Sequence, residues 1–166
     1  EDALPLVRER ARLMSEDVPA GAMAAVIGMD PPAILAALPP DVDVANFNGP
    51  GQTIVSGAEE AVARAIDALK AAGAKRVMPL KVSGAFHSRL MAPAALAFRD
   101  SLRDVPIAAP KVRFISSVSA REETDPGRIR TLLGEQIAAS VQWTGVMEAI
   151  GPAPAFEVGP GRVLQG

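Results

Sequence analysis

The chain has 166 residues, of which 49% are apolar and 22% are charged, a composition typical of a domain that folds around an apolar core. Its 17 Lys and Arg residues and 19 Asp and Glu residues give a net charge of −2, which lacks the basic excess expected of a nucleic-acid-binding protein. The absence of cysteine and the single histidine exclude a disulfide framework, a cysteine nucleophile and a multi-histidine metal site. No apolar stretch is long enough to span a bilayer, so we expect a cytoplasmic α/β domain that has neither nucleic acid nor a membrane as its partner.

The first half of the chain predicts a small subdomain of strands and helices. The expected elements are a helix over 4–14, a strand over 22–28, a helix opened by Asp30-Pro31, strands over 42–47 and 52–56, a helix ending near Gly73 and a strand over 77–82. Residues 21–82 therefore follow the βαββαβ order, which is the ferredoxin-like arrangement.

Two local motifs support these boundaries. Residues 48–51 (Asn-Gly-Pro-Gly) predict a four-residue hairpin loop between two strands. Residues 56–59 (Ser-Gly-Ala-Glu) have the S-x-x-E form of a capping box, which predicts that the Ser56 side chain caps the following helix.

The second half of the chain predicts a different set of elements. The expected elements are a helix over 88–103, a strand over 112–116, a helix opened by Asp125-Pro126, a helix over 143–150, a strand over 155–158 and the start of a further helix near the last residue. We expect residues 1–19 and 83–166 to form part of a larger α/β domain into which the small subdomain, residues 20–82, is inserted.

His87 is the only histidine, and it lies between an expected strand end and an expected helix start. Folds of the α/β class place ligands at such junctions, and the positive end of a helix favours a neutral imidazole that can act as a general base. A capping or half-buried structural histidine is equally compatible with this position.

Arg10 and Gln136 are the other polar candidates. Arg10 lies in a run of charged residues that is typical of a solvated helix face, but an arginine turned inward could hold a carboxylate with its two-pronged guanidinium. Gln136 falls in register with apolar residues of its helix, so its amide should face the protein. There it either satisfies neighbouring backbone groups or supports a site.

Seven segments match a known family in order and spacing. They are VRERARLM (7–14), GAMAAVIG (21–28), NFNGPGQ (46–52), AGAKR (72–76), FHSRLM (86–91), VQW (141–143) and EVGPG (157–161). The chain resembles malonyl-CoA:acyl carrier protein transacylase, an acyltransferase family of fatty-acid and polyketide synthesis, from Glu1 to Gly166. The family's large α/β-hydrolase-like domain with a ferredoxin-like insertion agrees with the predicted order of elements.

The resemblance implies a covalent, two-step acyl transfer from coenzyme A to a serine and then to acyl carrier protein. It implies that His87 is the base and that the backbone carbonyl of Gln136 orients its ring. Arg10 matches the arginine that binds the malonyl carboxylate, Phe86 would exclude an α-methyl group, and Asn48 would line the cleft between the subdomains. Malonyl-CoA and acyl carrier protein are the implied partners, and no cofactor is implied beyond the coenzyme A thioester substrate.

Two motifs of the family are missing from this sequence. Neither the G-H-S-L-G segment that contains the serine nucleophile nor the G-Q-G-S-Q segment of the oxyanion hole occurs, and the resemblance places both before Glu1. We therefore expect a C-terminal fragment that is inactive alone. The alternative is a non-catalytic module that binds acyl carrier protein or a small ligand, and an RNA-binding ferredoxin-like sheet is disfavoured by the net charge and the lack of paired aromatics.

Overall fold

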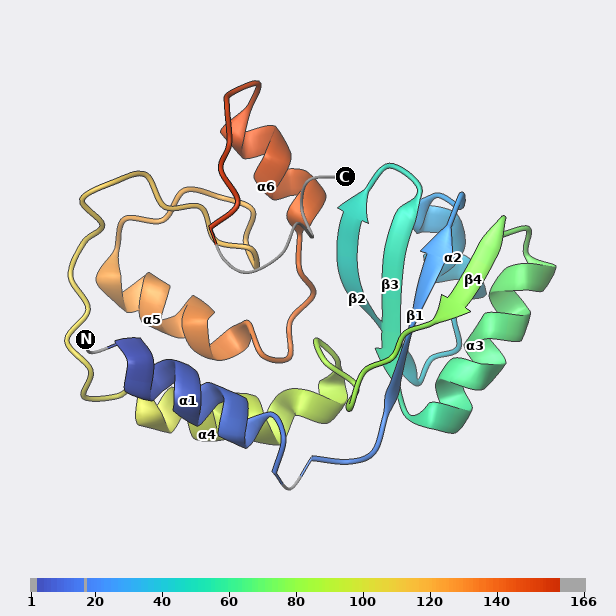
Figure 1. The fold of residues 1–166 in the computed structure, drawn as a ribbon, viewed down its shortest axis with the longest axis horizontal. Coiled ribbons are helices and arrows are strands. Elements are labelled where there is room, and N and C mark those ends of the chain that lie inside the picture. The colour runs from blue at the N-terminus through green and yellow to red at the C-terminus, as the bar shows by residue number, and fades with distance from the viewer. Residues whose placement is uncertain (1–2, 17, 159–166) are drawn as a thin grey trace.

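The computed structural model describes residues 3–16 and 18–158 and contains one antiparallel sheet beside a group of helices (Figure 1). The elements in chain order are α1 (Ala3–Leu13), β1 (Ala22–Ile27), α2 (Pro31–Ala37), β2 (Val42–Gly49), β3 (Gln52–Gly57), α3 (Glu59–Ala71), β4 (Arg76–Pro79), the 3-10 helix η1 (Arg89–Met91), α4 (Ala92–Ser101), α5 (Pro126–Glu135) and α6 (Trp143–Ile150). The protein is therefore of the α/β class. The expected helix start near the last residue lies outside the described residues.

The sheet has the strand order β2-β3-β1-β4, and each neighbouring pair is antiparallel. Because successive side chains of a strand point to opposite faces, β1 contributes Ala24 and Val26 to one face and Met23 and Ala25 to the other. The first face packs against α2 and α3, where Ile34 and other apolar side chains complete the larger core. Both central strands are largely buried on both faces, which fits a sheet covered on both sides.

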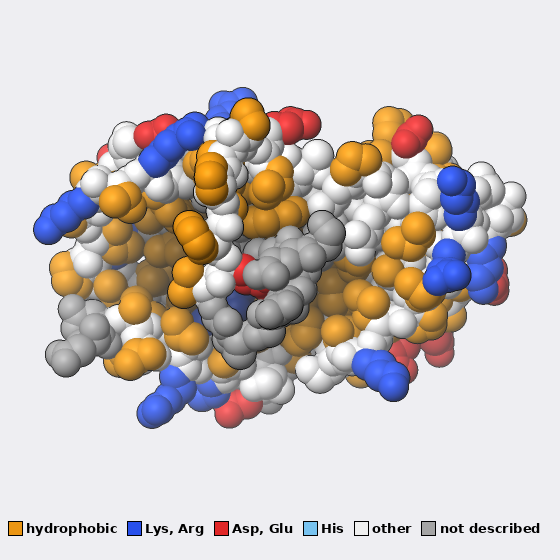
Figure 2. Space-filling view, turned by 45° about the horizontal axis from the view of Figure 1, so that its top comes forward, with side chains coloured by type: hydrophobic (Ala, Val, Ile, Leu, Met, Phe, Trp, Pro, Cys, Tyr) orange, Lys and Arg blue, Asp and Glu red, His pale blue; other side chains and the backbone are white. Residues whose placement is uncertain are grey.

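The helices α1, α4 and α5 pack together in the other half of the molecule (Figure 1). Their core contains Phe98, Leu102 and Ile137, and Leu6 and Leu13 of α1 pack against it. The opposite side of α1 leaves Leu4 and other apolar side chains in solvent, and none of the residues of this helix is fully buried. Figure 2 shows such hydrophobic side chains exposed over the helical half of the molecule.

The segment between α5 and α6 joins the two halves. It runs parallel to the outer edge of β2, where the Val141 amide donates to the Ala45 carbonyl at 2.8 Å and the Phe47 amide donates to the Val141 carbonyl at 2.9 Å. The Thr144 hydroxyl adds a third hydrogen bond, to the Phe47 carbonyl at 3.2 Å. The outer edge of the sheet is thereby paired along part of its length.

Most of the predicted helices and strands are confirmed, but two predicted strands are wrong. Residues 112–116 form only an isolated bridge between Ile115 and Glu122, and Val112 is 79% exposed. Residues 155–158 are not part of a strand in the described structure. A strand is a ladder of several hydrogen-bonded residues, and the two backbone hydrogen bonds between residues 114–116 and 121–123 support only a single bridge.

The predicted capping box is also wrong. Ser56 belongs to β3, where its side chain is buried, and α3 begins at Glu59 after Ala58, which makes no side-chain capping bond. The helix expected over 88–103 divides into η1 and α4, with Pro93 in the first turn of α4. Proline fits that place because it has no amide hydrogen to lose.

No helix of the described residues is long and apolar enough to cross a membrane. Within the same ranges, 3–16 and 18–158, no group of three or more acidic, histidine or cysteine side chains could hold a metal ion.

Candidate functional site

The His87 imidazole lies in the loop between β4 and η1 and is held by a backbone carbonyl. Its Nδ1 lies 2.9 Å from the carbonyl oxygen of Gln136, at the C-terminal end of α5. A carbonyl oxygen only accepts hydrogen bonds, so Nδ1 must carry the proton and donate it. In the neutral ring Nε2 then has a free lone pair, which is the arrangement a general base requires.

The backbone around His87 is constrained. His87 has φ = 56°, in the left-handed region that residues other than glycine seldom adopt. The hydroxyl of the next residue, Ser88, is buried, donates to the Ala85 carbonyl at 2.6 Å and accepts the Leu90 amide at 3.3 Å. Such strained conformations persist where neighbouring contacts determine them, and they are common at functional sites.

Gln136 is half-buried, as its helical register predicted. Its backbone amide completes α5 by donating to the Leu132 carbonyl at 2.9 Å, which fixes the peptide whose carbonyl faces His87. Its side-chain Nε2 donates to the Ser117 hydroxyl at 3.1 Å. Ser117 was not predicted, because its partner is 19 residues away in sequence and no local pattern connects the two.

The Arg10 side chain is turned toward the protein interior, which is one of the two orientations that the sequence left open. Its side chain is partly buried on α1, and its Nε is fully buried with no hydrogen-bond partner among the described residues. Burial lowers the pKa of its guanidinium, although the group remains charged at neutral pH. Arg10 lies close enough to His87 for its positive charge to act on the ring.

Four effects set the pKa of His87. Burial lowers it most, the hydrogen bond to the Gln136 carbonyl raises it, the charge of Arg10 lowers it, and the backbone of Ala139 raises it. The net pKa of His87 lies below the ordinary value of 6.5, so the ring is neutral at pH 7. His87, Gln136 and Arg10 are therefore brought together in one site.

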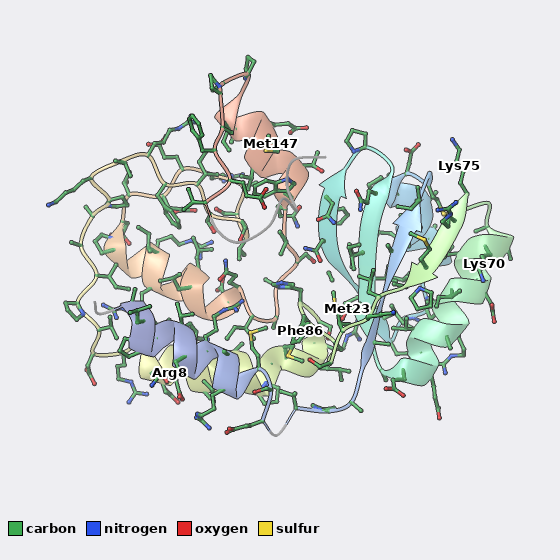
Figure 3. The ribbon with its side chains drawn as sticks, in the orientation of Figure 1. Arg8, Met23, Lys70, Lys75, Phe86 and Met147 are labelled. Atoms are coloured by element: carbon green, nitrogen blue, oxygen red, sulfur yellow. The ribbon has the colours of Figure 1, made fainter. Side chains whose placement is uncertain are left out.

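The remaining two predicted residues are Phe86 and Asn48. Phe86 is half-buried where the helices meet the sheet and packs toward Met23, as Figure 3 shows. Asn48 is half-buried near the end of β2, and within the described part of the chain no hydrogen bond joins it to His87, Gln136 or Arg10. The structure thus places Phe86 beside the site and leaves Asn48 without a direct link to it.

Comparison with known proteins gives the family. The model of the acyl transferase domain matches residues 1–158. The chain belongs to the acyl transferase domain family. A curated member, the malonyl CoA-acyl carrier protein transacylase of Escherichia coli K12, is 44% identical over 175 residues, which cover 99% of this chain and 57% of that protein. The chain thus spans little more than half the length of the curated relatives that it matches.

Solved structures of the family agree with this fold. The acyl carrier protein S-malonyltransferase of Vibrio cholerae superposes with a TM-score of 0.90 at 40% identity, over 99% of this chain and 57% of that one. A malonyl-transacylase solved in complex with a type II polyketide-synthase acyl carrier protein gives a TM-score of 0.79 at 39% identity, over 86% of this chain and 48% of that one.

Proposed function

We propose that the protein to which these residues belong transfers a malonyl group from coenzyme A to acyl carrier protein. The observation that supports this most strongly is the neutral His87 ring, held by the Gln136 carbonyl with Arg10 nearby. A base and a cation for a carboxylate are what the transfer of a malonyl group requires. The names of the curated relatives favour this enzyme over the non-catalytic binding module.

The proposed first step forms a malonyl-serine ester. His87 Nε2 takes the proton of a serine hydroxyl that a segment outside this sequence provides, while the serine oxygen bonds to the thioester carbonyl carbon. The carbon–sulfur bond then breaks, and the coenzyme A sulfur leaves with the proton held by His87. The second step reverses this sequence with the phosphopantetheine thiol of acyl carrier protein and restores the free serine. Coenzyme A thioester is a substrate here, and the proposed steps involve no resident cofactor.

The other site residues have proposed roles in recognition. Arg10 binds the free malonyl carboxylate through charge-assisted hydrogen bonds, which contribute on the order of 1.5–3 kcal/mol each. Phe86 limits the space beside the α-carbon of the acyl group, and Asn48 lines the cleft between the subdomains. Gln136 acts through its backbone carbonyl, so its side chain matters less than its position.

The division into subdomains is part of the same proposal. Residues 20–82 form a ferredoxin-like subdomain, which the strand order β2-β3-β1-β4 with two helices on one face supports. Residues 1–19 and 83–166 form part of a large α/β-hydrolase-like domain. The solved complex of a malonyl-transacylase with its carrier protein supports acyl carrier protein as the partner.

Arg10→Ala in the complete protein tests this proposal. We expect malonyl transfer to fall at least tenfold and acetyl transfer to change less than twofold, because only malonate offers a carboxylate. His87→Ala should abolish the malonyl adduct that intact-protein mass spectrometry detects after incubation with malonyl-CoA. Equal losses for both acyl groups in Arg10→Ala, or a normal adduct in His87→Ala, would refute it.

A further inference from the structure

One acidic side chain on β2 holds the loop that contains His87. Asp43 accepts the backbone amide of Arg89 at 2.8 Å and the Arg89 guanidinium at 2.6 to 3.0 Å. Arg89 is two residues beyond His87. The carboxylate therefore fixes the main chain next to His87 as well as a surface side chain.

The next two residues of β2 hold the segment that follows Gln136. The Val44 carbonyl accepts the hydroxyl of Ser140, and the Ala45 carbonyl accepts the Val141 amide at 2.8 Å. Ser140 lies four residues beyond Gln136. Three consecutive residues of one strand thus anchor both partners of the His87–Gln136 hydrogen bond.

We propose that Asp43 is a positioning residue for His87 and sets the place of the imidazole against the Gln136 carbonyl. This inference rests on the proposed function, in which His87 is the base. The contacts form a closed path through the chain. It runs from Asp43 through Arg89 and His87 to Gln136, and it returns through Ser140 to β2. If the Asp43 link is removed, the left-handed residue is held by the Ser88 contacts, by core packing and by its own hydrogen bond to Gln136, with less to fix the main chain that follows it.

Asp43 is suited to this role by its charge and burial. Its side chain is 24% exposed, whereas most ion pairs of this protein join side chains that are about half exposed or more. Burial raises the pKa of the carboxyl group, but the hydrogen bonds from Arg89 lower it more, so the net pKa lies below the ordinary value. The side chain is therefore ionised at neutral pH and binds the guanidinium with both oxygens.

The chain offers a matched control two residues earlier. Asp41 pairs with Arg64 of α3, and both side chains are more than half exposed. This pair has the same chemistry and lies near the same end of β2. The charge of Asp41 acts on Arg89, but the hydrogen bonds of Arg89 in the described structure go to Asp43, so Asp41 controls for the loss of negative charge without the loss of the link. A general effect of losing an acidic side chain at this end of β2 would appear equally in Asp41→Ala.

The test compares Asp43→Ala, Asp43→Asn and Asp41→Ala in the complete protein. For Asp43→Ala we expect kcat for malonyl transfer to fall about tenfold, less than the roughly hundredfold that displacing a catalytic group by about 1 Å can cost, with KM for malonyl-CoA within twofold. Asp43→Asn can still accept the Arg89 amide, so its kcat should fall by an intermediate amount. Asp41→Ala should retain kcat within twofold.

The outcomes separate this inference from the proposed function. If the unmodified protein forms an adduct that depends on His87, but both Asp43 variants keep full kcat, the positioning role of Asp43 is wrong and the proposed function stands. A kcat loss in Asp41→Ala equal to that in Asp43→Asn would also overturn it. Because Asp43→Asn is nearly isosteric, it provides the kinetic result even if Asp43→Ala does not fold.

Discussion

The protonation state of His87 depends on neighbours from three parts of the chain. The surrounding protein removes water from the ring, α5 supplies the Gln136 carbonyl, and α1 brings the charge of Arg10 near it. Two of these effects disfavour the imidazolium, and the carbonyl fixes which nitrogen carries the proton. The imidazole is therefore kept neutral by groups that come from separate parts of the chain.

The lowered pKa of His87 predicts how stability depends on pH. Below the unfolded pKa of about 6.5 the unfolded chain binds a proton that the folded state resists, so the free energy of unfolding should fall as pH drops through this range and level off below the folded pKa. His87→Gln should remove this part of the dependence. Urea denaturation at pH 7.5, 6.5 and 5.5 measures both proteins, and an NMR titration of the imidazole with a midpoint at or above 6.5 would contradict the prediction.

Replacing Arg10 with a neutral side chain of similar length should lower malonyl transfer and raise the free energy of unfolding. Arg10→Met removes a partly buried charge whose Nε has no partner, so we expect unfolding to require up to about 1 kcal/mol more and the pKa of His87 to rise. Thermal unfolding and the same imidazole titration measure the two effects. Arg8→Met, on the exposed side of α1, is the control and should change neither.

A site residue could be predicted from the sequence only where the residues near it in the chain mark it. His87 was found as a lone histidine at a strand-to-helix junction, and Gln136 by its helical register. Their hydrogen bond joins residues 49 apart in sequence, and the pairing of Asp43 with Arg89 joins residues 46 apart. Such pairs depend on how the chain folds back, which periodicity and turn motifs do not specify.

The same distinction holds for whole elements. The predicted hairpin forms, but its loop is shorter than expected, because β2 extends to Gly49 and only residues 50 and 51 lie between the strands. The helix after Asp125-Pro126 forms as predicted because its cap is encoded nearby; the Asp125 side chain accepts the Arg128 amide at 2.6 Å. The segments 112–116 and 155–158 have residues suited to strands, but the first forms only one isolated bridge and the second is not part of a strand in the described structure. A helix satisfies its own backbone, whereas a strand depends on distant residues.

At Gly21, directly before β1, the backbone lies very close to the loop that precedes His87. A Cβ at Gly21 would lie 2.5 Å from the Ala85 Cβ and 2.9 Å from the Gly57 carbonyl oxygen. Gly21→Ala should therefore cost about 1–3 kcal/mol of stability and displace the loop. Gly49→Ala is the control, since a Cβ there has nothing within 4 Å, and it should be neutral or slightly stabilising. Equal chemical-denaturation midpoints for the two variants would show that the close approach is unimportant.

At the scale of the whole molecule, each half has its own apolar core. The larger core lies on the helix-covered face of the sheet, and a separate core lies among α1, α4 and α5. Between them, the segment after Gln136 pairs with β2 through Val141. The site depends on this junction because His87 follows β4 while Gln136 ends α5.

Breaking one hydrogen bond of that junction should therefore loosen the site without disrupting either core. Val141→Pro removes the amide that donates to the Ala45 carbonyl, and leaving that carbonyl unpaired should cost about 1–3 kcal/mol. We expect hydrogen exchange to accelerate at the Phe47 amide, which donates to residue 141, and to remain slow at Val62 in α3. Val112→Pro, at an exposed position where the described structure gives the amide no partner, should change stability by less than about 0.5 kcal/mol. Uniformly faster hydrogen exchange in both halves of Val141→Pro would mean that the two halves unfold as one unit. The prediction that the junction loosens by itself would then be wrong.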